Sequence, residues 1–257
     1  MKQLKSSSVD LRKIFETISA GFISEPFASF DAEADVNMVR SFMAEQDYDV
    51  IGVRRNGLVV GNARRSDLGR GALSDYMVEF QDMEIVDASA PLIELLRHMR
   101  KSPRVYVRLL GEVGGIITSG DLQKAPVRMW LFGVISLIEM QLLRIIRQTY
   151  RDDSWDKFIK PDRLDSARQI LNDRKQKNAD IDLADCLQFC DKRDIVIGNL
   201  WPQLGFESWE SGMHLLKDVE GLRNNLAHSQ DIVTGFWPGL INLADDAENF
   251  LLKLEST

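Results

Sequence analysis

Residues 50–68 read VIGVRRNGLVVGNARRSDL, and residues 104–122 read RVYVRLLGEVGGIITSGDL. The two stretches align at a constant offset of 54 residues, so the first half of the chain contains an internal repeat. The aligned pairs are Ile51/Val105, Val53/Val107, Arg54/Arg108, Gly57/Gly111, Gly61/Gly115, Asp67/Asp121 and Leu68/Leu122. Both copies are therefore expected to fold in the same way and to pack as equivalents.

A helical pattern precedes each of these stretches. In residues 31–46 and 87–101, apolar residues recur at steps of three and four, which is typical of an amphipathic helix. The aligned pairs are Val36/Leu92, Val39/Leu95 and Met43/Met99, at an offset of 56. The second copy therefore lacks two residues between its helix and its strand, a change that loops absorb easily.

Each copy is expected to fold in the same order. Asp31 or Asp87 opens the helix, and an alternating strand follows. The chain then turns at Gly57 or Gly111 into a second strand that ends in a polar turn.

This repeated pattern resembles the CBS domain, which occurs as tandem pairs. The resemblance covers about residues 27–124, with a lead-in helix at residues 9–20. It places copy one at about 27–68 and copy two at about 83–124, within a first domain of residues 1–126. It implies a non-catalytic α/β module with a pseudo-twofold repeat, and such modules often bind adenine nucleotides in the cleft between the copies.

The nucleotide signature of that family is a Thr or Ser, two further residues and an Asp after the second strand. Copy two has Thr118 and Asp121 in these places, whereas copy one has Arg64 and Asp67, within Arg64-Arg65-Ser66-Asp67. A carboxylate can accept hydrogen bonds from both ribose hydroxyls, and an arginine in place of the hydroxyl favours a phosphate. The resemblance implies a nucleotide site containing these four residues. The alternative is that both aspartates only cap helices.

From Pro126 onward the strand pattern stops, and a second domain of residues 127–257 is predicted to be helical. The expected helices are Val127–Tyr150, Pro161–Lys177, Leu183–Leu200, Ser208–Ser229 and Gly239–Leu254. The chain is thus predicted to be an α+β protein, with an α/β pair followed by an all-α domain. The first helix is apolar nearly all round over residues 129–143, which favours a central helix or a subunit interface.

The fourth helical stretch, SWESGMHLLKDVEGLRNNLAHSQD over residues 208–231, has the most informative pattern. The predicted core stripe, within about 60° on a helical wheel, is Leu215, Val219, Leu222 and Leu226. Asn224 and His228 share the opposite side. Arg223 lies at the edge of the stripe, about 140° from His228.

The run RNNLAH, from Arg223 to His228, resembles the signature of the HEPN superfamily, and the resemblance covers residues 127–257. Many members are metal-independent ribonucleases that act as dimers, whereas others only bind RNA or a partner. In the first case His228 would be the general acid or base near pH 7. Arg223 would stabilise charge on phosphorus, and Asn224 would orient either group. The alternative is structural: His228 caps a helix end, and Arg223 pairs with Glu220.

Arg223 and His228 are poorly placed to meet on a single helix. A site composed from two chains explains their spacing better, so a homodimer formed through the apolar helix 129–143 is expected.

The composition excludes several classes of protein. Of 257 residues, 44% are hydrophobic and 28% are charged, which excludes a disordered chain. The net charge is −7, and residues 127–257 contain 16 basic and 21 acidic residues, which disfavours broad contact with phosphates. Cys186 and Cys190 have no His nearby in sequence, so they are expected to be reduced core residues and no metal site is predicted.

The location is expected to be cytoplasmic. The segment MKQLKSSSVDLRKIFE has no apolar signal-peptide core. The apolar stretch 129–143 is shorter than the roughly 20 residues that span a bilayer, so no membrane partner is expected.

Together these features predict a nucleotide-responsive, metal-independent ribonuclease, such as a toxin or a stress or defence effector. RNA would be its substrate and an adenine nucleotide its regulatory ligand, with no catalytic cofactor. The alternative is a non-catalytic regulatory or scaffolding protein that binds adenine nucleotide and dimerises or binds a partner through its helical domain, and the acidic second domain favours it. A shared cleft for Arg223 and His228 would favour the enzyme, and separate exposure would favour the alternative.

Overall fold

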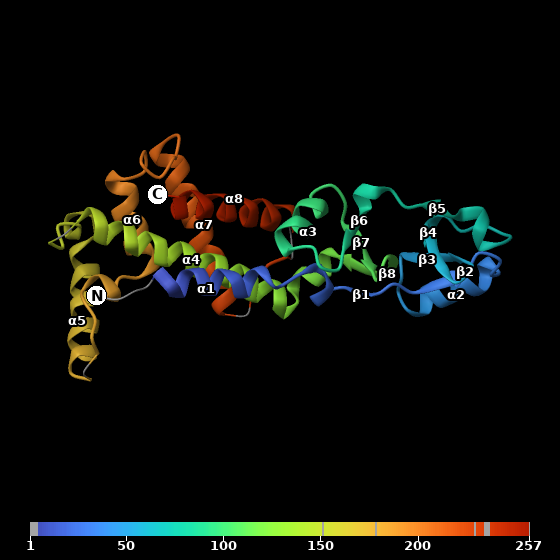
Figure 1. Cartoon of the computed structure of the whole chain (residues 1–257), viewed down its shortest axis with the longest axis horizontal. Coiled ribbons are helices and arrows are strands. Elements are labelled where there is room, and N and C mark those ends of the chain that lie inside the picture. The colour runs from blue at the N-terminus through green and yellow to red at the C-terminus, as the bar shows by residue number, and fades with distance from the viewer. Residues whose placement is uncertain (1–4, 151, 178, 229, 234–236, 257) are drawn as a thin grey trace. The chain divides into compact units, whose positions relative to one another are not determined.

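The computed structural model describes residues 5–150, 152–177, 179–228, 230–233 and 237–256, without the side chains of residues 5–9 and 256. The chain divides into two compact units, one of Glu16–Val127 and one of Met1–Phe15 together with Arg128–Thr257. All strands of the described chain lie in the first of these, and the other is built of helices, so the protein is α+β (Figure 1).

The unit Glu16–Val127 contains two four-stranded sheets of the same design. Their strand orders are β2-β3-β4-β5 and β1-β8-β7-β6. The strands are β1 (Glu25–Pro26), β2 (Ser29–Asp31), β3 (Val50–Arg55), β4 (Leu58–Arg64), β5 (Val78–Glu79), β6 (Ile85–Asp87), β7 (Arg104–Leu109) and β8 (Glu112–Thr118). In each sheet an antiparallel hairpin has a parallel strand on one side and an antiparallel strand on the other.

The two central hairpins have the same register. The pairs at their open ends are Val50 with Arg64 and Arg104 with Thr118. Both ladders also shift register at the same place, after Val53 in one copy and after Val107 in the other. Residues 51–53 and 105–107 are buried in equivalent positions. The predicted structural repeat is therefore confirmed.

Glycines occupy equivalent positions in the two hairpins. Gly57 and Gly111 have φ values of 82° and 93° in two-residue turns, a conformation that favours glycine. Gly61 and Gly115 lie where the outer strands β5 and β1 pair with the hairpins. A Cβ atom on Gly115 would lie 2.1 Å from the Ser24 Oγ. The aligned glycines therefore follow from the backbone geometry of each copy.

The helices of the two copies begin later than the sequence predicts. They are α2 (Val36–Glu45) and α3 (Leu92–Met99). Asp35, not Asp31, caps α2, and its carboxylate accepts from two backbone N–H groups of the first turn at 2.9 and 3.2 Å. Asp31 and Asp87 instead end β2 and β6, where they pair with Arg54 at 3.1 Å and Arg108 at 3.5 Å. The prediction that Asp31 and Asp87 open the helices is wrong, because cross-strand arginines hold both aspartates.

The second unit is built from six helices within the described chain. They are α1 (Lys5–Glu16), α4 (Ala125–Thr149), α5 (Pro161–Lys175), α6 (Phe189–Asn199), α7 (Trp209–Ala227) and α8 (Trp237–Ser256). The five helices predicted for residues 127–257 correspond to α4–α8, although the predicted end at Ser229 lies outside the described residues. Short 3₁₀ turns complete the unit.

The N-terminal helix differs from the expected lead-in helix at residues 9–20. It spans Lys5–Glu16, and the chain up to Phe15 groups with the helical unit. Arg12 joins it to α8 through Glu248 at 2.6 Å and Glu255 at 2.8 Å. The unit Glu16–Val127 is thus inserted between α1 and the rest of the helical unit.

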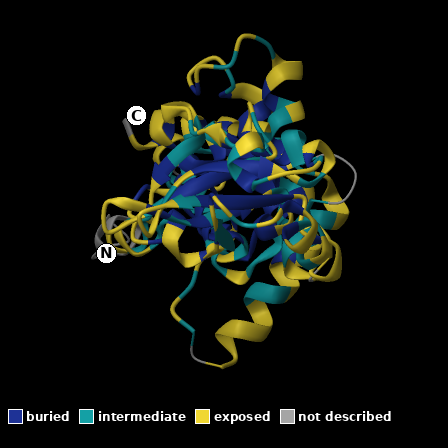
Figure 2. Cartoon of the chain, turned by 90° about the vertical axis from the view of Figure 1, so that its right-hand side faces the viewer, coloured by how far each residue is buried: buried dark blue, intermediate teal, exposed yellow. Residues whose placement is uncertain are grey.

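Helix α4 is long and apolar enough to cross a membrane by length and composition, with a mean hydropathy of 1.7 over its most apolar window. However, 61% of that window is buried inside the protein, and a core helix meets the same criterion. The predicted burial on several sides is therefore confirmed. Met129 and Phe132 are the large apolar residues of α4 that stay exposed, so the surface excess from which a dimer was predicted is mostly covered by the chain itself. Figure 2 shows the buried interior in dark blue.

Candidate functional site

The end of the second copy is closed by its own hydrogen bonds. Thr118 ends β8, and the Asp121 carboxylate in the following 3₁₀ turn reaches back to it. One carboxylate oxygen of Asp121 accepts from the Thr118 backbone N–H at 2.7 Å and from its Oγ1 at 3.0 Å. Asp121 is 9% exposed, so it is a buried cap of this turn. The capping alternative from the sequence is thus present in this copy.

Lys124 occupies the other oxygen of Asp121. Its ammonium lies 2.8 Å from Asp121 Oδ1, donates to the Ile23 backbone oxygen at 2.7 Å and forms an ion pair with Glu25. A carboxylate has about four acceptor positions, and three are filled here. Two ribose hydroxyls would therefore compete with Lys124 for Asp121.

The end of the first copy has different chemistry. Arg64 ends β4 and is exposed, and Arg65 pairs with Asp49 at 3.1 Å. Asp67 is exposed and accepts from the Ser66 hydroxyl at 2.7 Å. Asp67 therefore does not form the buried cap that its counterpart Asp121 forms.

A hollow of about 390 Å³ lies at this end and is lined from both copies. Its lining residues are Asp49, Arg64, Arg65, Ser66 and Arg104, and we call it the arginine hollow. Arg104 begins β7 and is the cross-strand partner of Thr118, so one residue that lines the hollow neighbours the second copy's signature residue. Three guanidinium groups face one carboxylate among the lining residues, a balance that suits an anion.

The sequence singled out Arg64, Thr118, Asp67 and Asp121 but not Arg104. Arg104 aligns with Val50 at the offset of 54, so the repeat itself gives no sign of it. Because it begins a strand beside Thr118, only the pairing register of the hairpin could have indicated its place.

Tyr106 lies beneath this cationic region. Burial raises the pKa of its phenol to about 12, against the opposing effect of the nearby Arg104. Its ring packs on Phe27 and Phe80, with centroid distances of 5.1 and 4.6 Å. Tyr106 therefore ties the arginine-bearing strand to a small apolar core shared by both copies.

The three candidate catalytic residues of the RNNLAH motif, Arg223, Asn224 and His228, lie at the end of α7. His228 follows the helix as its C-cap residue and is exposed. Asn224 is exposed and accepts from the Arg223 guanidinium at 3.2 Å, and Arg223 is half-buried. Within the described residues, no hydrogen bond joins the side chains of Arg223 and His228. Within one chain His228 is exposed, whereas Arg223 is half-buried with its guanidinium on Asn224.

Of the two structural alternatives predicted for this motif, the cap is present, because His228 is the C-cap residue of α7 and its backbone N–H donates to the Asn224 carbonyl oxygen at 3.1 Å. The pairing of Arg223 with Glu220 is absent from the described residues. Glu220 pairs with Arg193 rather than with Arg223. The carbonyl oxygens at the end of α7 are bound by Arg128, which donates to Leu226 at 3.2 Å and to Gln230 at 2.9 Å. Asn224 thus holds the Arg223 guanidinium, and His228 ends α7 as its C-cap residue with an exposed side chain.

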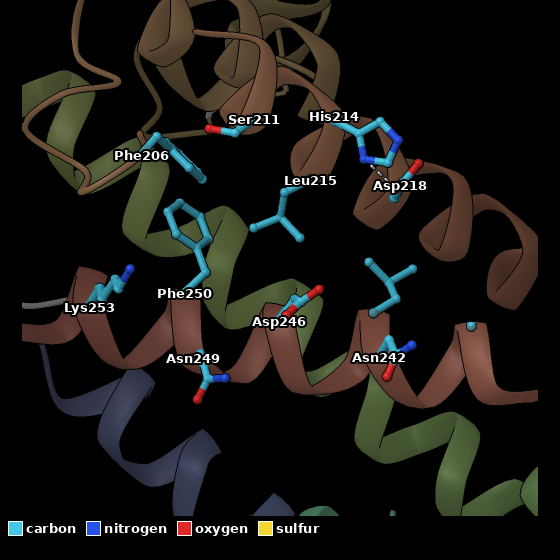
Figure 3. Close-up of a pocket in the computed structure, with 12 residues that line it drawn as sticks. Phe206, Ser211, His214, Leu215, Asp218, Asn242, Asp246, Asn249, Phe250 and Lys253 are labelled. Atoms are coloured by element: carbon cyan, nitrogen blue, oxygen red, sulfur yellow. Dashed lines mark ion pairs between the residues drawn. The ribbon is translucent and has the colours of Figure 1, made fainter. Parts of the chain in front are cut away.

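A groove of about 620 Å³ lies between α7 and α8 in the helical unit (Figure 3). The predicted core stripe of α7 is corrected here. Val219 and Leu222 are buried as predicted, but Leu216 takes the place of Leu215 in the core. Leu215 is half-buried because it faces the groove, where Figure 3 shows it opposite α8.

The described residues contain no group of three metal-ligating side chains. Cys186 is buried and Cys190 is half-buried, and burial raises the pKa of both thiols. These cysteines therefore have the surroundings of packed thiols.

Comparisons with known proteins bear on less than half of the chain. No family model and no curated protein matches the sequence. An uncharacterized conserved protein from Pyrococcus horikoshii is 21% identical, with 42% of this chain and 90% of that chain covered and a TM-score of 0.37. The CBS domain of a bacterial CNNM/CorC family Mg²⁺ transporter is 17% identical, with 49% of this chain and 86% of that chain covered and a TM-score of 0.37. CBSX2 in complex with AMP is 18% identical, with 43% of this chain and 97% of that chain covered and a TM-score of 0.38.

Proposed function

We propose that this protein is a nucleotide-responsive regulator whose unit Glu16–Val127 binds an adenine nucleotide, with the phosphates in the arginine hollow. The observation that carries the proposal is the convergence of Arg64, Arg65 and Arg104 on one hollow in a chain of net charge −7. Guanidinium groups bind phosphate through paired, charge-assisted hydrogen bonds. The preference for adenine comes from the resemblance of the repeat to CBS pairs.

The ribose is assigned to Asp121, beside Thr118 and Arg104. Asp121 is largely engaged by Thr118 and Lys124, so a bound nucleoside displaces Lys124 from the carboxylate. A nucleotide whose phosphates bind Arg64 and Arg104 supplies the interaction energy for that exchange. Adenosine alone is expected to bind weakly.

Calorimetric titration of the full chain tests this function. AMP, ADP, ATP and S-adenosylmethionine are titrated separately, with adenosine as the ligand that lacks phosphate. We expect at least one phosphorylated adenine nucleotide to bind. Adenosine should bind at least about tenfold more weakly, since each lost charged hydrogen bond costs about 1.5 kcal/mol. Absence of binding by all four charged ligands would contradict the proposal.

For the helical unit, the placement of Arg223 and His228 favours a binding role over the predicted ribonuclease activity. Among the described residues no hydrogen bond joins Arg223 to His228, and residues 127–257 contain 16 basic and 21 acidic residues. A second candidate remains a metal-independent ribonuclease formed by two chains, supported by the exposure of the Asn224 and His228 side chains. Its site would take Arg223, Asn224 and His228 from each of two copies.

An RNA cleavage assay in EDTA separates the two candidates. The wild-type protein is compared with Arg223→Ala and His228→Ala, and His214→Ala is the matched control. The binding role predicts no cleavage above the level of the variants. Cleavage that leaves a 2′,3′-cyclic phosphate and is lost only in Arg223→Ala and His228→Ala would establish the ribonuclease instead.

A further inference from the structure

The α7–α8 groove has an apolar floor that the chain leaves uncovered. Leu215 from α7 and Leu243 from α8 are half-buried within it. At one end Phe206 and Phe250 stack with their ring centroids 5.0 Å apart, as Figure 3 shows. Covering apolar side chains removes them from water and so stabilises an assembly, and this floor therefore favours an apolar occupant.

The rim of the groove is polar and carries more acid than base at its centre. Asp246 of α8 is exposed and has no ion pair among the described residues. Asp218 of α7 faces the same groove and pairs with His214 at 3.0 Å. Lys253 lies at the far end, beside the aromatic pair (Figure 3). The helical unit, residues 1–15 and 128–257, has 20 basic and 22 acidic residues, so the attraction of the groove for cations comes from Asp218 and Asp246 themselves.

The length of the groove matches a helix. On α8 the groove is lined from Gly239 to Lys253, fifteen residues or about 21 Å of helix axis. That length is about four helical turns, which present apolar anchors at steps of three and four residues to a groove.

We infer that the α7–α8 groove binds a basic amphipathic helix of a partner protein. The partner's apolar face covers Leu215, Leu243 and Phe206, and its lysines or arginines lie against Asp218 and Asp246. RNA is disfavoured by the same charges. The groove lies wholly in the helical unit, so this inference holds independently of nucleotide binding by the other unit.

The probe is a fluorescent 18-residue helical peptide with leucines along one face and lysines on the other. Its matched control has glutamate in place of every lysine. Fluorescence anisotropy with the full-length protein should give saturable binding of the lysine peptide that weakens as salt rises, and about tenfold weaker binding of the glutamate peptide. Amide hydrogen exchange should slow in α7 and α8 when the lysine peptide binds.

Variants locate the site. Leu215→Ala and Leu243→Ala together, and Asp246→Lys alone, should each weaken the lysine peptide about tenfold. Asp173→Lys makes the same charge change on an exposed residue of α5 and should leave the affinity unchanged. Circular dichroism confirms that each variant keeps its helical content.

Three results would overturn the inference. One is equal binding of the two peptides, and another is unchanged binding in the groove variants. The third is a different occupant: a single-stranded RNA oligonucleotide that protects α7 and α8, or a dimer in light scattering that Asp246→Lys converts to a monomer.

Discussion

The two copies of the repeat have the same backbone but opposite chemistry where their second strands end. In copy two, Asp121 is buried and is held by Thr118 and Lys124. In copy one, Arg64 is exposed at the equivalent of Thr118, and Asp67 is exposed. A duplicated scaffold thus holds one end that is internally neutralised and one end that presents cations. The comparison teaches that the two half-sites of the pair are not interchangeable.

The same asymmetry is present in the packing between the copies. Tyr106 of β7 aligns with Gly52 of β3 at the offset of 54. A Cβ atom on Gly52 would lie 3.1 Å from the Phe27 ring and 2.9 Å from the Ser29 Cβ. The Phe27 ring also packs against Tyr106. One large and one minimal side chain therefore fill the space that two identical residues could not share.

The largest expected effect is on stability at the two aligned aspartates. Asp121→Ala should lower the free energy of unfolding by about 2–3 kcal/mol, because it leaves the Thr118 N–H and Oγ1 without their acceptor and removes one of the three partners of Lys124. Asp67→Ala should change it by less than about 0.5 kcal/mol, since Asp67 is exposed. Urea denaturation measures both values. Equal losses would show that the copies carry equivalent caps.

A second expected effect appears at high pH and belongs to copy two alone. Burial raises the pKa of Tyr106 to about 12, whereas an unfolded tyrosine ionises near pH 10. The proton is thus held more tightly in the folded protein than in the unfolded chain. The protonated Tyr106 therefore contributes stability that is fully present below pH 10 and is lost as the pH rises through 12. The loss should reach about 2 kcal/mol.

Tyr106→Phe is the variant that checks this effect, because it keeps the aromatic packing with Phe27 and Phe80. Denaturation between pH 9 and 12 should show a shallower decline in stability for the variant than for the wild type. An identical decline in both proteins would assign the alkaline loss to other groups.

The smallest expected effect concerns Lys124. Lys124→Met should lower the free energy of unfolding by about 1 kcal/mol, since the ion pairs it loses are partly exposed. The same change should tighten AMP binding severalfold, because Asp121 regains an acceptor position for the ribose. Weaker AMP binding would show that Lys124 contacts the nucleotide instead of competing with it.

The repeat and the helical second half could be predicted from sequence because their signals are local. Aligned glycines mark the turns at Gly57 and Gly111, and alternating apolar residues mark the buried strands. The position of the first helix cap was missed because Asp31 and Asp35 both suit an N-cap, and only the pairing of Asp31 with Arg54 decides between them.

The arginine hollow and the α7–α8 groove could not be predicted, because both depend on contacts between distant segments. Arg104 and Arg64 meet through sheet pairing and packing of the copies, which periodicity does not encode. On α7, Leu215 and Leu216 both have the spacing of a core residue, and the placement of α8 decides which one is buried.

The most direct test of the account is the affinity of ATP for the full-length Arg64→Ala protein, measured by calorimetry beside the wild type. Arg55→Ala, an exposed arginine at the opposite end of β3, is the matched control. We predict that Arg64→Ala weakens ATP binding about tenfold, leaves adenosine binding unchanged and does not alter the fold. ATP affinity that is equal in the wild type, Arg64→Ala and Arg55→Ala would contradict the claim that the first copy holds the phosphates.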